Sequence, residues 1–510
     1  MTAADGNLYA LFRSRFPADR RETVIETETG RRYSYADLET ISGRYARLLR
    51  ETGIAPGDRV LVQTEKSPEA LFLYLACLRA GAIYVPLNIA YRAAELAYFI
   101  GDAEPRVIVC DPAARAAIEE PARAARVARL FTLDASGAGT LVDESGSLPP
   151  LDADAALHTD DTAAILYTSG TTGRSKGAML THGNLSSNAL TLHRAWGFRP
   201  GDVLLHALPI FHTHGLFVAS NCVLLNGTGM LFLAKFDAAT VMRLLPRATV
   251  FMGVPTFYTR LLAESRFDRE TCRTIRLFIS GSAPLLDETF HAFRARTGHT
   301  ILERYGMTEA GMITSNPLDG ARIAGSVGPP LPGIEVRVAA DDGRLLPQGE
   351  TGVLEIRGPN LFKGYWRMPE KTKEEFRADG FFITGDVARI DQEGYVSIVG
   401  RAKDLIISGG FNVYPKEVEM QIDAIAGIAE SAVIGVPHPD FGEAVAAVVT
   451  TKPGVAAPSA ESIIATLKGE LANFKVPKQV FFTDDLPRNA MGKVQKNVLR
   501  DRYKDTFRPA

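Results

Sequence analysis

Apolar and polar positions in the first 300 residues follow two alternating periods. Residues 34–53 place apolar side chains at helical spacing and end at a glycine, and residues 57–65 (GDRVLVQTE) then have the pattern of a strand. Similar helix–strand pairs follow at 68–88 and 93–111, and a second series occupies 201–298. This alternation predicts parallel sheets covered by helices on both faces. Ligands of such sheets bind beyond the carboxyl ends of the strands, where GSAP (281–284) and YGMTE (305–309) are expected.

The pattern changes after residue 333. Residues 334–358 alternate as strands do, with turn signals at Asp342-Gly343 and Gln348-Gly349, which predicts a small β-subdomain. Beyond residue 400, strand and helix patterns mix over a stretch of about 110 residues, enough for a separate domain. We therefore predict an α/β N-terminal domain (1–401), with two doubly wound parallel-type sheets plus the β-subdomain. A smaller, mobile α+β C-terminal domain (402–510) should follow.

Composition narrows the class of protein. The chain has 510 residues and a formal net charge of −2, whereas nucleic-acid-binding proteins usually carry a basic surplus. The apolar region 216–234 is interrupted by Asn221, Asn226 and glycines, so we expect a buried helix, a turn and a strand there rather than a membrane span. Four widely spaced cysteines indicate a reducing compartment: Cys77, Cys110, Cys222 and Cys272. We expect a soluble cytoplasmic protein that binds neither nucleic acid nor membrane.

The segment LYTSGTTGRSKG (166–177) has the composition of a phosphate-binding loop. Its glycines allow backbone N–H groups to converge on an anion, and its hydroxyls and Lys176 add donors. The spacing differs from that of the P-loop of nucleotide triphosphatases, and a merely flexible loop has a similar composition. The preceding strand-like run Asp161–Tyr167 anchors one end, which favours phosphate binding.

Five motifs in order extend this interpretation along the whole chain: YTSGTTGRSKG, YGMTE, TGD, GRAKDLIISGG and PRNAMGK. Together they resemble the acyl-adenylate-forming superfamily, which includes AMP-forming acyl-CoA synthetases, beetle luciferases and peptide-synthetase adenylation domains. The resemblance implies an acid–thiol ligase that uses ATP, Mg²⁺ and coenzyme A. A carboxylate attacks the α-phosphorus of ATP, pyrophosphate leaves, and the thiol of coenzyme A then displaces AMP.

The resemblance also implies roles for individual residues. Tyr305 would stack on adenine, Thr308 would bind the α-phosphate, Asp386 and Arg401 would bind the ribose, and Lys493 would be the catalytic lysine. Glu309, with Thr171, would hold the magnesium ion, because hard cations prefer oxygen ligands. The other nucleotide-binding residues would be Thr168, Ser169, Gly170, Thr172, Gly173, Lys176, Gly281, Ser282, Ala283 and Gly306.

A second set of implied roles concerns the C-terminal domain. Lys403 would be the hinge about which this domain rotates after adenylation, and Gly409 and Gly410 would line the tunnel for the pantetheine arm. Lys493 would be a target for a lysine acetyltransferase, since acetylation removes its charge. Lys496, in contrast, is expected to be an ordinary surface lysine.

The identity of the acid depends on Arg304. Many members with apolar pockets have glycine at this position, and a guanidinium would instead clamp a second carboxylate. His212, a further catalytic candidate, His214 and Ser282 would line the same pocket. The alternative is a structural ion pair between Arg304 and Glu303. The chain looks most like malonyl-CoA synthetases, with oxalyl-CoA, methylmalonyl-CoA and other acyl- or aryl-CoA synthetases left open.

Three more distant classes fit less well. A luciferase-like oxygenase would need an extended aromatic pocket, which Arg304 opposes. A peptide-synthetase module would be followed by a carrier domain, and no such segment follows in this sequence. A non-catalytic relative would be expected to lack Lys493 or Glu309, and both are present.

Overall fold

The computed structural model describes residues 6–168, 175–340, 342–408, 411–489 and 491–507. Its contacts divide the chain into two compact units. The first comprises residues 1–324, 328–335 and 357–382, and the second comprises 325–327, 336–356 and 383–510. The predicted β-subdomain therefore clusters largely with the C-terminal part. The predicted boundary between residues 401 and 402 stays a prediction.

The first unit contains an eight-stranded sheet in the order β14-β13-β12-β11-β9-β10-β1-β2. Its central strands are parallel, and β2 and β14 are antiparallel to their neighbours because each follows the adjacent strand through a short connection. The strands are β1 (Thr23–Thr27), β2 (Arg32–Ser34), β9 (Val203–His206), β10 (Gly229–Phe232), β11 (Val250–Gly253), β12 (Leu277–Ser280), β13 (Leu302–Met307) and β14 (Gly311–Ser315).

A seven-stranded sheet in the order β17-β8-β7-β4-β3-β5-β6 forms the rest of this unit's framework. Strands β7, β4, β3, β5 and β6 are parallel, whereas β7 and β8 form an antiparallel hairpin that carries the segment predicted to bind phosphate. The strands are β3 (Arg59–Gln63), β4 (Ile83–Pro86), β5 (Val107–Cys110), β6 (Arg129–Thr132), β7 (Thr162–Thr168), β8 (Lys176–Thr181) and β17 (Gly364–Tyr365).

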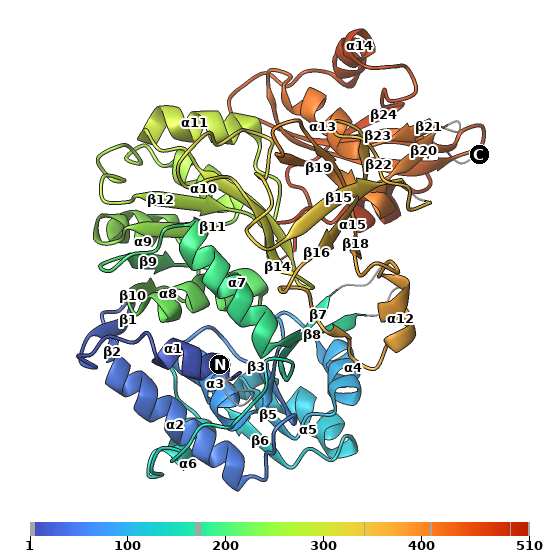
Figure 1. Ribbon diagram of the computed structural model, residues 1–510. Helices are drawn as coiled ribbons and strands as arrows, with labels where there is room; N and C mark the ends of the chain where they lie inside the picture. The colour runs from blue at the N-terminus through green and yellow to red at the C-terminus, as the bar shows by residue number, and fades with distance from the viewer. Residues whose placement is uncertain (1–5, 169–174, 341, 409–410, 490, 508–510) are drawn as a thin grey trace. The chain divides into compact units, whose positions relative to one another are not determined.

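The helices of the first unit cover these sheets (Figure 1). Helices α9–α11 pack on β9, β11 and β12 around Phe251, Tyr258 and Phe293, and α4 and α5 pack on β3–β5. Helix α3 is buried along its whole length, begins at the N-cap Ser67 and ends at the left-handed Gly81. The helices are α1 (Leu8–Arg13), α2 (Tyr35–Glu51), α3 (Pro68–Ala80), α4 (Ala93–Ala103), α5 (Arg115–Ala124), α6 (Thr140–Ser145), α7 (His182–Ala195), α8 (Asn221–Asn226), α9 (Ala238–Leu244), α10 (Pro255–Ala263), α11 (Asp287–Thr297) and α12 (Pro369–Glu374), with shorter 3₁₀ turns at Pro112–Ala114 and Leu245–Arg247 and a π-helix, η2 (His214–Ser220).

The second unit contains a four-stranded sheet (β15-β16-β18-β19) and a five-stranded sheet (β21-β20-β23-β22, with β24 on β23). Helices α13 and α14 cover one face of the five-stranded sheet, and α15 covers the other through Leu499. The elements are β15 (Glu335–Ala339), β16 (Thr351–Arg357), β18 (Phe382–Ile390), β19 (Val396–Arg401), η4 (Ala402–Asp404), β20 (Ile406–Ser408), β21 (Phe411–Val413), α13 (Pro415–Asp423), β22 (Ile428–His438), β23 (Gly442–Thr451), α14 (Ala460–Glu470), β24 (Gln479–Phe482) and α15 (Lys496–Tyr503).

The α/β and α+β classes predicted for the two parts are thus confirmed. Residues 216–234 form the end of the π-helix, helix α8 and strand β10, as predicted. In the part of the chain that the structure describes, no helix has the length and apolar character needed to span a membrane.

Candidate active site

The β7–β8 hairpin sets the base of the predicted phosphate-binding loop. Thr168 and Lys176 face each other in the register of the two strands, so the loop begins and ends at adjacent positions. Ser169, Gly170, Thr171, Thr172 and Gly173 lie outside the described residues. The Lys176 ammonium lies 2.7 Å from a carboxylate oxygen of Glu375 and 4.0 Å from the centre of the Tyr365 ring.

The turn Thr308–Ala310 follows β13 and presents Glu309. Gly306 allows β13 and β14 to approach closely here, because a Cβ at this position would lie 2.2 Å from the carbonyl oxygen of Gly311. The Glu309 carboxylate is buried, and burial raises its pKa. The Tyr365 hydroxyl lies 3.0 Å from a Glu309 oxygen and 2.7 Å from a Glu375 oxygen. Sequence reasoning missed Tyr365 and Glu375 because no motif singled them out.

The segment Gly281–Ala283 leaves the carboxyl end of β12, as predicted. Ser282 has a φ of 74°, a left-handed conformation that is strained for a residue with a side chain. Its hydroxyl lies 3.1 Å from Nδ1 of His214, which fixes the serine side chain toward the histidines. The structure therefore brings Ser282 and His214 together, as the sequence predicted.

Arg304 is buried on β13, with 2% of its surface exposed. Its guanidinium lies against Gly281, where a Cβ would come within 2.5 Å of Cζ and Nη1. Among the described residues, neither Nε nor Nη2 of Arg304 has a hydrogen-bond partner. Burial lowers the pKa of Arg304 to about 9, so the group is still charged at neutral pH.

The alternative pairing of Arg304 with Glu303 is not formed. Adjacent residues of a strand point to opposite faces, and a Glu303 oxygen accepts a hydrogen bond of 3.1 Å from the backbone N–H of Leu285. Glu303 therefore fixes the loop after β12, and its charge acts on Arg304 only through an attraction that raises the pKa of the guanidinium. The result is a buried cation with unused donors and no ion pair among the described residues.

Two histidines complete the surroundings of Arg304. Burial, together with the Arg304 charge, lowers the pKa of His212 to about 4 and that of His214 well below its ordinary value. Both rings are therefore neutral at pH 7. In the described part of the chain, Nε2 of the fully buried His214 has no partner. A buried cation beside neutral imidazoles is an environment suited to an anionic ligand.

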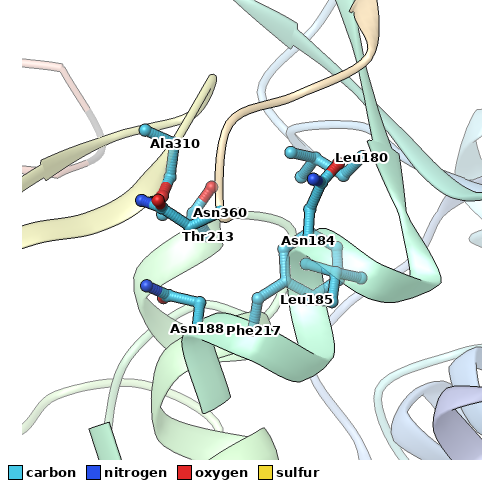
Figure 2. Close-up of a pocket in the computed structure, with 9 residues that line it drawn as sticks. Leu180, Asn184, Leu185, Asn188, Thr213, Phe217, Ala310 and Asn360 are labelled. Carbon is cyan, nitrogen blue, oxygen red and sulfur yellow. The ribbon is translucent and has the colours of Figure 1, made fainter. Parts of the chain in front are cut away.

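A small cavity lies beside this site, between α7, η2 and the 308–311 turn (Figure 2). Its volume of about 10 Å³ admits roughly one water molecule, so it is too small for an acyl group. Its wall includes Thr213, which lies between the two histidines, and Asn360, whose amide N–H donates to the carbonyl oxygen of Ala310 at 2.7 Å. The cavity thus marks where the histidine segment and the Glu309 turn come together.

The predicted ribose ligands are paired in the second unit. Asp386 on β18 faces Arg401 on β19, and Asp386 Oδ1 lies 2.8 Å from Nε of Arg401. The backbone N–H of Asp386 donates to the Thr384 hydroxyl at 3.0 Å, and the carboxylate is buried. The ion pair holds the carboxylate in one orientation.

Lys493 lies at the end of a tight hairpin loop in the same unit. Asn489 closes the loop, since its backbone N–H donates to the Lys493 carbonyl at 2.9 Å and its side-chain oxygen accepts from the Lys493 N–H at 3.0 Å. Burial and the charge of Arg401 lower the pKa of Lys493 to about 8, while Asp386 and Asp404 raise it. Lys493 is thus close enough to the Asp386–Arg401 pair to sense both charges.

The hinge candidate Lys403 lies in the 3₁₀ turn η4, and burial lowers its pKa. Gly409 and Gly410, predicted to line the thiol tunnel, lie outside the described residues. Lys496 differs from the expectation of an ordinary surface lysine: its ammonium lies 2.6 Å from Glu419, a largely buried carboxylate. It therefore anchors α15 to α13.

Comparison with known families decides the class. The profile of AMP-binding enzymes matches residues 13–366, and that of the AMP-binding enzyme C-terminal domain matches residues 417–493. The chain belongs to the AMP-binding enzyme family. The resemblance to acyl-adenylate-forming enzymes, predicted from five motifs, is thereby confirmed.

Several AMP-binding enzymes resemble this one along nearly their whole length. The crystal structure of ATP-bound MatB from Rhodopseudomonas palustris is 57% identical, covers 99% of this chain and 100% of that chain, and superposes with a TM-score of 0.96. A malonate–CoA ligase from Arabidopsis thaliana is 33% identical over 98% of this chain and 90% of that protein. A feruloyl-CoA synthase from Amycolatopsis is 37% identical over 93% of this chain and 94% of that protein.

Proposed function

We propose that this AMP-binding enzyme joins a short dicarboxylic acid, malonate first of all, to coenzyme A through an acyl-AMP intermediate. The observation that carries the proposal is the buried Arg304 guanidinium, whose Nε and Nη2 are unpaired among the described residues. One carboxylate of the acid reacts, and the other would accept two charge-assisted hydrogen bonds from this guanidinium. The pairing offsets part of the cost of burying the cation.

The relatives support this choice, because malonate–CoA ligases and the 57% identical MatB are among the proteins that this chain resembles along nearly its whole length. Proteins described as a malonate–CoA ligase and as a feruloyl-CoA synthase have comparable identity to this chain. Identity at this level is therefore compatible with both a small dianion and a large aromatic acid. Arg304 favours the dianion, because an aromatic tail would leave the buried guanidinium without a partner. Methylmalonate and oxalate remain alternatives, since one methyl group changes binding by only about 1–3 kcal/mol.

In the first half-reaction a carboxylate oxygen attacks the α-phosphorus and pyrophosphate leaves. Two anions approach each other, so catalysis depends on cations and positioned donors. We assign this task to the Lys493 ammonium, with the Thr308 hydroxyl as a donor to the α-phosphate and His212 as a positioning donor on the acid. Tyr305, Asp386 and Arg401 would hold adenine and ribose, with the backbone of Gly281–Ala283 along the adenine edge.

Glu309 fits the role of a magnesium ligand. It is a buried carboxylate beside two other oxygen-bearing groups, and Mg²⁺ in such enzymes takes one or two protein carboxylates and completes its shell with phosphates and water. Among the described residues no cluster of three or more His, Cys, Asp or Glu side chains could hold a metal alone. We therefore propose a magnesium ion that arrives bound to the phosphates of ATP, with Thr171 as a further ligand. Bound there, it would neutralise phosphate charge.

In the second half-reaction the thiol sulfur attacks the acyl carbon, AMP leaves and the thiol proton is lost. We assign the change between half-reactions to rotation about Lys403, with Gly409 and Gly410 beside the pantetheine arm. Acetylation of Lys493 by a lysine acetyltransferase would stop the first step only. We place the enzyme in the cytoplasm.

The test is pyrophosphate release without coenzyme A, followed by thioester formation with it, across matched mono- and dicarboxylates. Malonate is expected to give the highest kcat/KM, above butyrate, oxalate, methylmalonate and ferulate. A preference for ferulate or butyrate over every dicarboxylate would refute the assignment of Arg304. Release of phosphate in place of pyrophosphate would refute the adenylation step.

A further inference from the structure

Lys66 is a buried lysine outside the sites described above. It follows strand β3 and is 7% exposed, with its ammonium 4.2 Å from the centre of the Phe232 ring. Its nitrogen lies 3.0 Å from Nδ1 of His206 and 2.9 Å from the His206 carbonyl oxygen. It forms no ion pair with a described carboxylate, although burying an ammonium is costly. All its close partners belong to the strand ends of the eight-stranded sheet.

The contacts of His206 define which ring nitrogen carries the proton. Its Nε2 lies 2.9 Å from the carbonyl oxygen of Gly215 and 3.1 Å from the Ser220 hydroxyl. A carbonyl oxygen only accepts, so Nε2 donates and Nδ1 is left to accept from Lys66. The Lys66 ammonium therefore donates to Nδ1 of His206, and Nε2–H of His206 donates to the carbonyl oxygen of Gly215, so the three residues form one chain of hydrogen bonds.

The end of this chain is the π-helix η2. Such wide turns are rare, and in this one the Gly215 carbonyl also accepts a hydrogen bond of 2.9 Å from the Ser220 hydroxyl. Gly215 is its second residue, and a Cβ there would lie 2.1 Å from the Pro209 carbonyl oxygen, so this turn is packed closely against its own approach segment. His214, the first residue of η2, lies at the site of Arg304 and Ser282.

We propose that Lys66 and His206 form a positioning pair that fixes the first turn of the π-helix and thereby aims His214 at the acid. The pair touches neither substrate nor nucleotide in this assignment. Its effect should therefore fall on binding of the acid and leave binding of ATP unchanged. The inference rests on the proposed function only in taking the acid to bind beside Arg304 and His214.

Variants of His206 separate the two bonds of the chain. His206→Gln places an amide N–H near the position of Nε2 and keeps the donor to Gly215, whereas His206→Asn is too short and keeps only an acceptor for Lys66. Lys66→Met removes the donors and retains most of the volume. We expect His206→Asn and Lys66→Met to raise KM for the preferred acid about tenfold, and His206→Gln to raise it less than about threefold. KM for ATP should stay within about twofold in all three.

A matched control uses the other end of the same helical segment. The Tyr74 hydroxyl lies 3.4 Å from Oδ1 of Asn221 in α8, and Tyr74→Phe removes this buried bond while keeping the ring, whose centre lies 5.7 Å from that of Phe217 in η2. Its KM for the acid should change less than about twofold. The double variant Lys66→Met/His206→Asn should be no worse than the more impaired single variant, because both break one chain.

Thermal unfolding of each variant distinguishes positioning from simple destabilisation. Equal changes in KM for the acid and for ATP, no rescue by His206→Gln, or independent effects in the double variant would each overturn the proposal. If Lys66→Met does not fold, the comparison of His206→Gln with His206→Asn decides alone. The KM measurements use whichever acid the unaltered enzyme prefers. If the proposed acid is incorrect, the panel of mono- and dicarboxylates shows it. If Lys66 and His206 do not position His214, the KM values of their variants show it.

Discussion

The two cationic residues assigned to the reaction are built in opposite ways. Arg304 lies on a strand in the first unit, 2% exposed, with its guanidinium packed against Gly281. Lys493 lies in the second unit on a hairpin loop closed by Asn489, and its pKa is lowered to about 8. A group that selects one substrate gains from a rigid sheet, because the bound geometry is prepared before the substrate arrives. A group needed in one half-reaction gains from a position on a part of the chain that rotates away, as proposed here for the part that follows Lys403.

The largest expected effect comes from removing the Lys493 ammonium. Lys493→Ala should lower the rate of acyl-AMP formation about a hundred- to a thousandfold, as loss of a preorganised transition-state donor typically does. Thioester formation from supplied acyl-AMP should be largely retained. The two half-reactions are measured separately, with the exposed Lys468→Ala as a matched control on α14. Equal losses in both would remove the assigned role.

Acetyl-lysine at position 493 tests the same group without shortening the side chain. Acetylation removes the charge, so adenylation should fall about as far as in Lys493→Ala. Full activity of the acetylated protein in pyrophosphate release would contradict the requirement for an ammonium.

The second-largest effect concerns Arg304, the buried cation of the first unit. Arg304→Gly removes the buried cation and should lower kcat/KM for malonate about ten- to a hundredfold, since a charge-assisted bond contributes about 1.5–3 kcal/mol. Butyrate should change little or improve. The ratio of the two values is the informative quantity, because a disrupted pocket would depress both. A parallel decline would make Arg304 structural.

Much of this could be predicted from local sequence, and the reasons for the rest are physical. Helix α3, strand β12 and the residue Arg304 follow from periodicity and motif position, because these signals are contained in a few neighbouring residues. The roles of Tyr365, Glu375 and the Lys66–His206 pair depend on contacts between distant segments. No local pattern encodes such contacts. Lys496 illustrates the same point, since its partner Glu419 lies on another helix.

The proposed hinge residue Lys403 belongs to the second unit. Restricting its backbone should affect one half-reaction only. Lys403→Pro fixes φ near the value of a helical turn, and Lys403 already lies in the 3₁₀ turn η4. We expect adenylation to survive and thioester formation to fall about tenfold, as for a variant held in one of two required conformations. The control is Lys403→Ala, which leaves φ free. Unchanged thioester formation in Lys403→Pro would move the hinge elsewhere.

A smaller change tests the support behind Arg304. Gly281→Ala would place a Cβ 2.5 Å from the guanidinium, so the side chain must shift, and KM for malonate should rise about fivefold. In an Arg304→Gly background the same substitution has no guanidinium to displace, and its effect should largely vanish. Equal effects in both backgrounds would show that Gly281 acts on the nucleotide rather than on the acid.

The smallest effect is a shift in pH dependence, and it separates the two cations most directly. Lys493 acts while charged, and a lysine is charged below its pKa. Adenylation should therefore fall as pH rises through about 8, with the half-maximal rate near that value. Burial lowers the pKa of Arg304 only to about 9, so KM for malonate should stay level between pH 7 and 8 while the rate declines.

Arg401 lowers the pKa of Lys493, so Arg401→Gln should move the pH profile of the adenylation rate to higher pH and leave the pH profile of KM for malonate unchanged. Thiolate formation has the opposite pH dependence, so the profile is measured by pyrophosphate release without coenzyme A. A rate that is flat through pH 9, or a profile unmoved in Arg401→Gln, would contradict the assignment of the titrating group to Lys493.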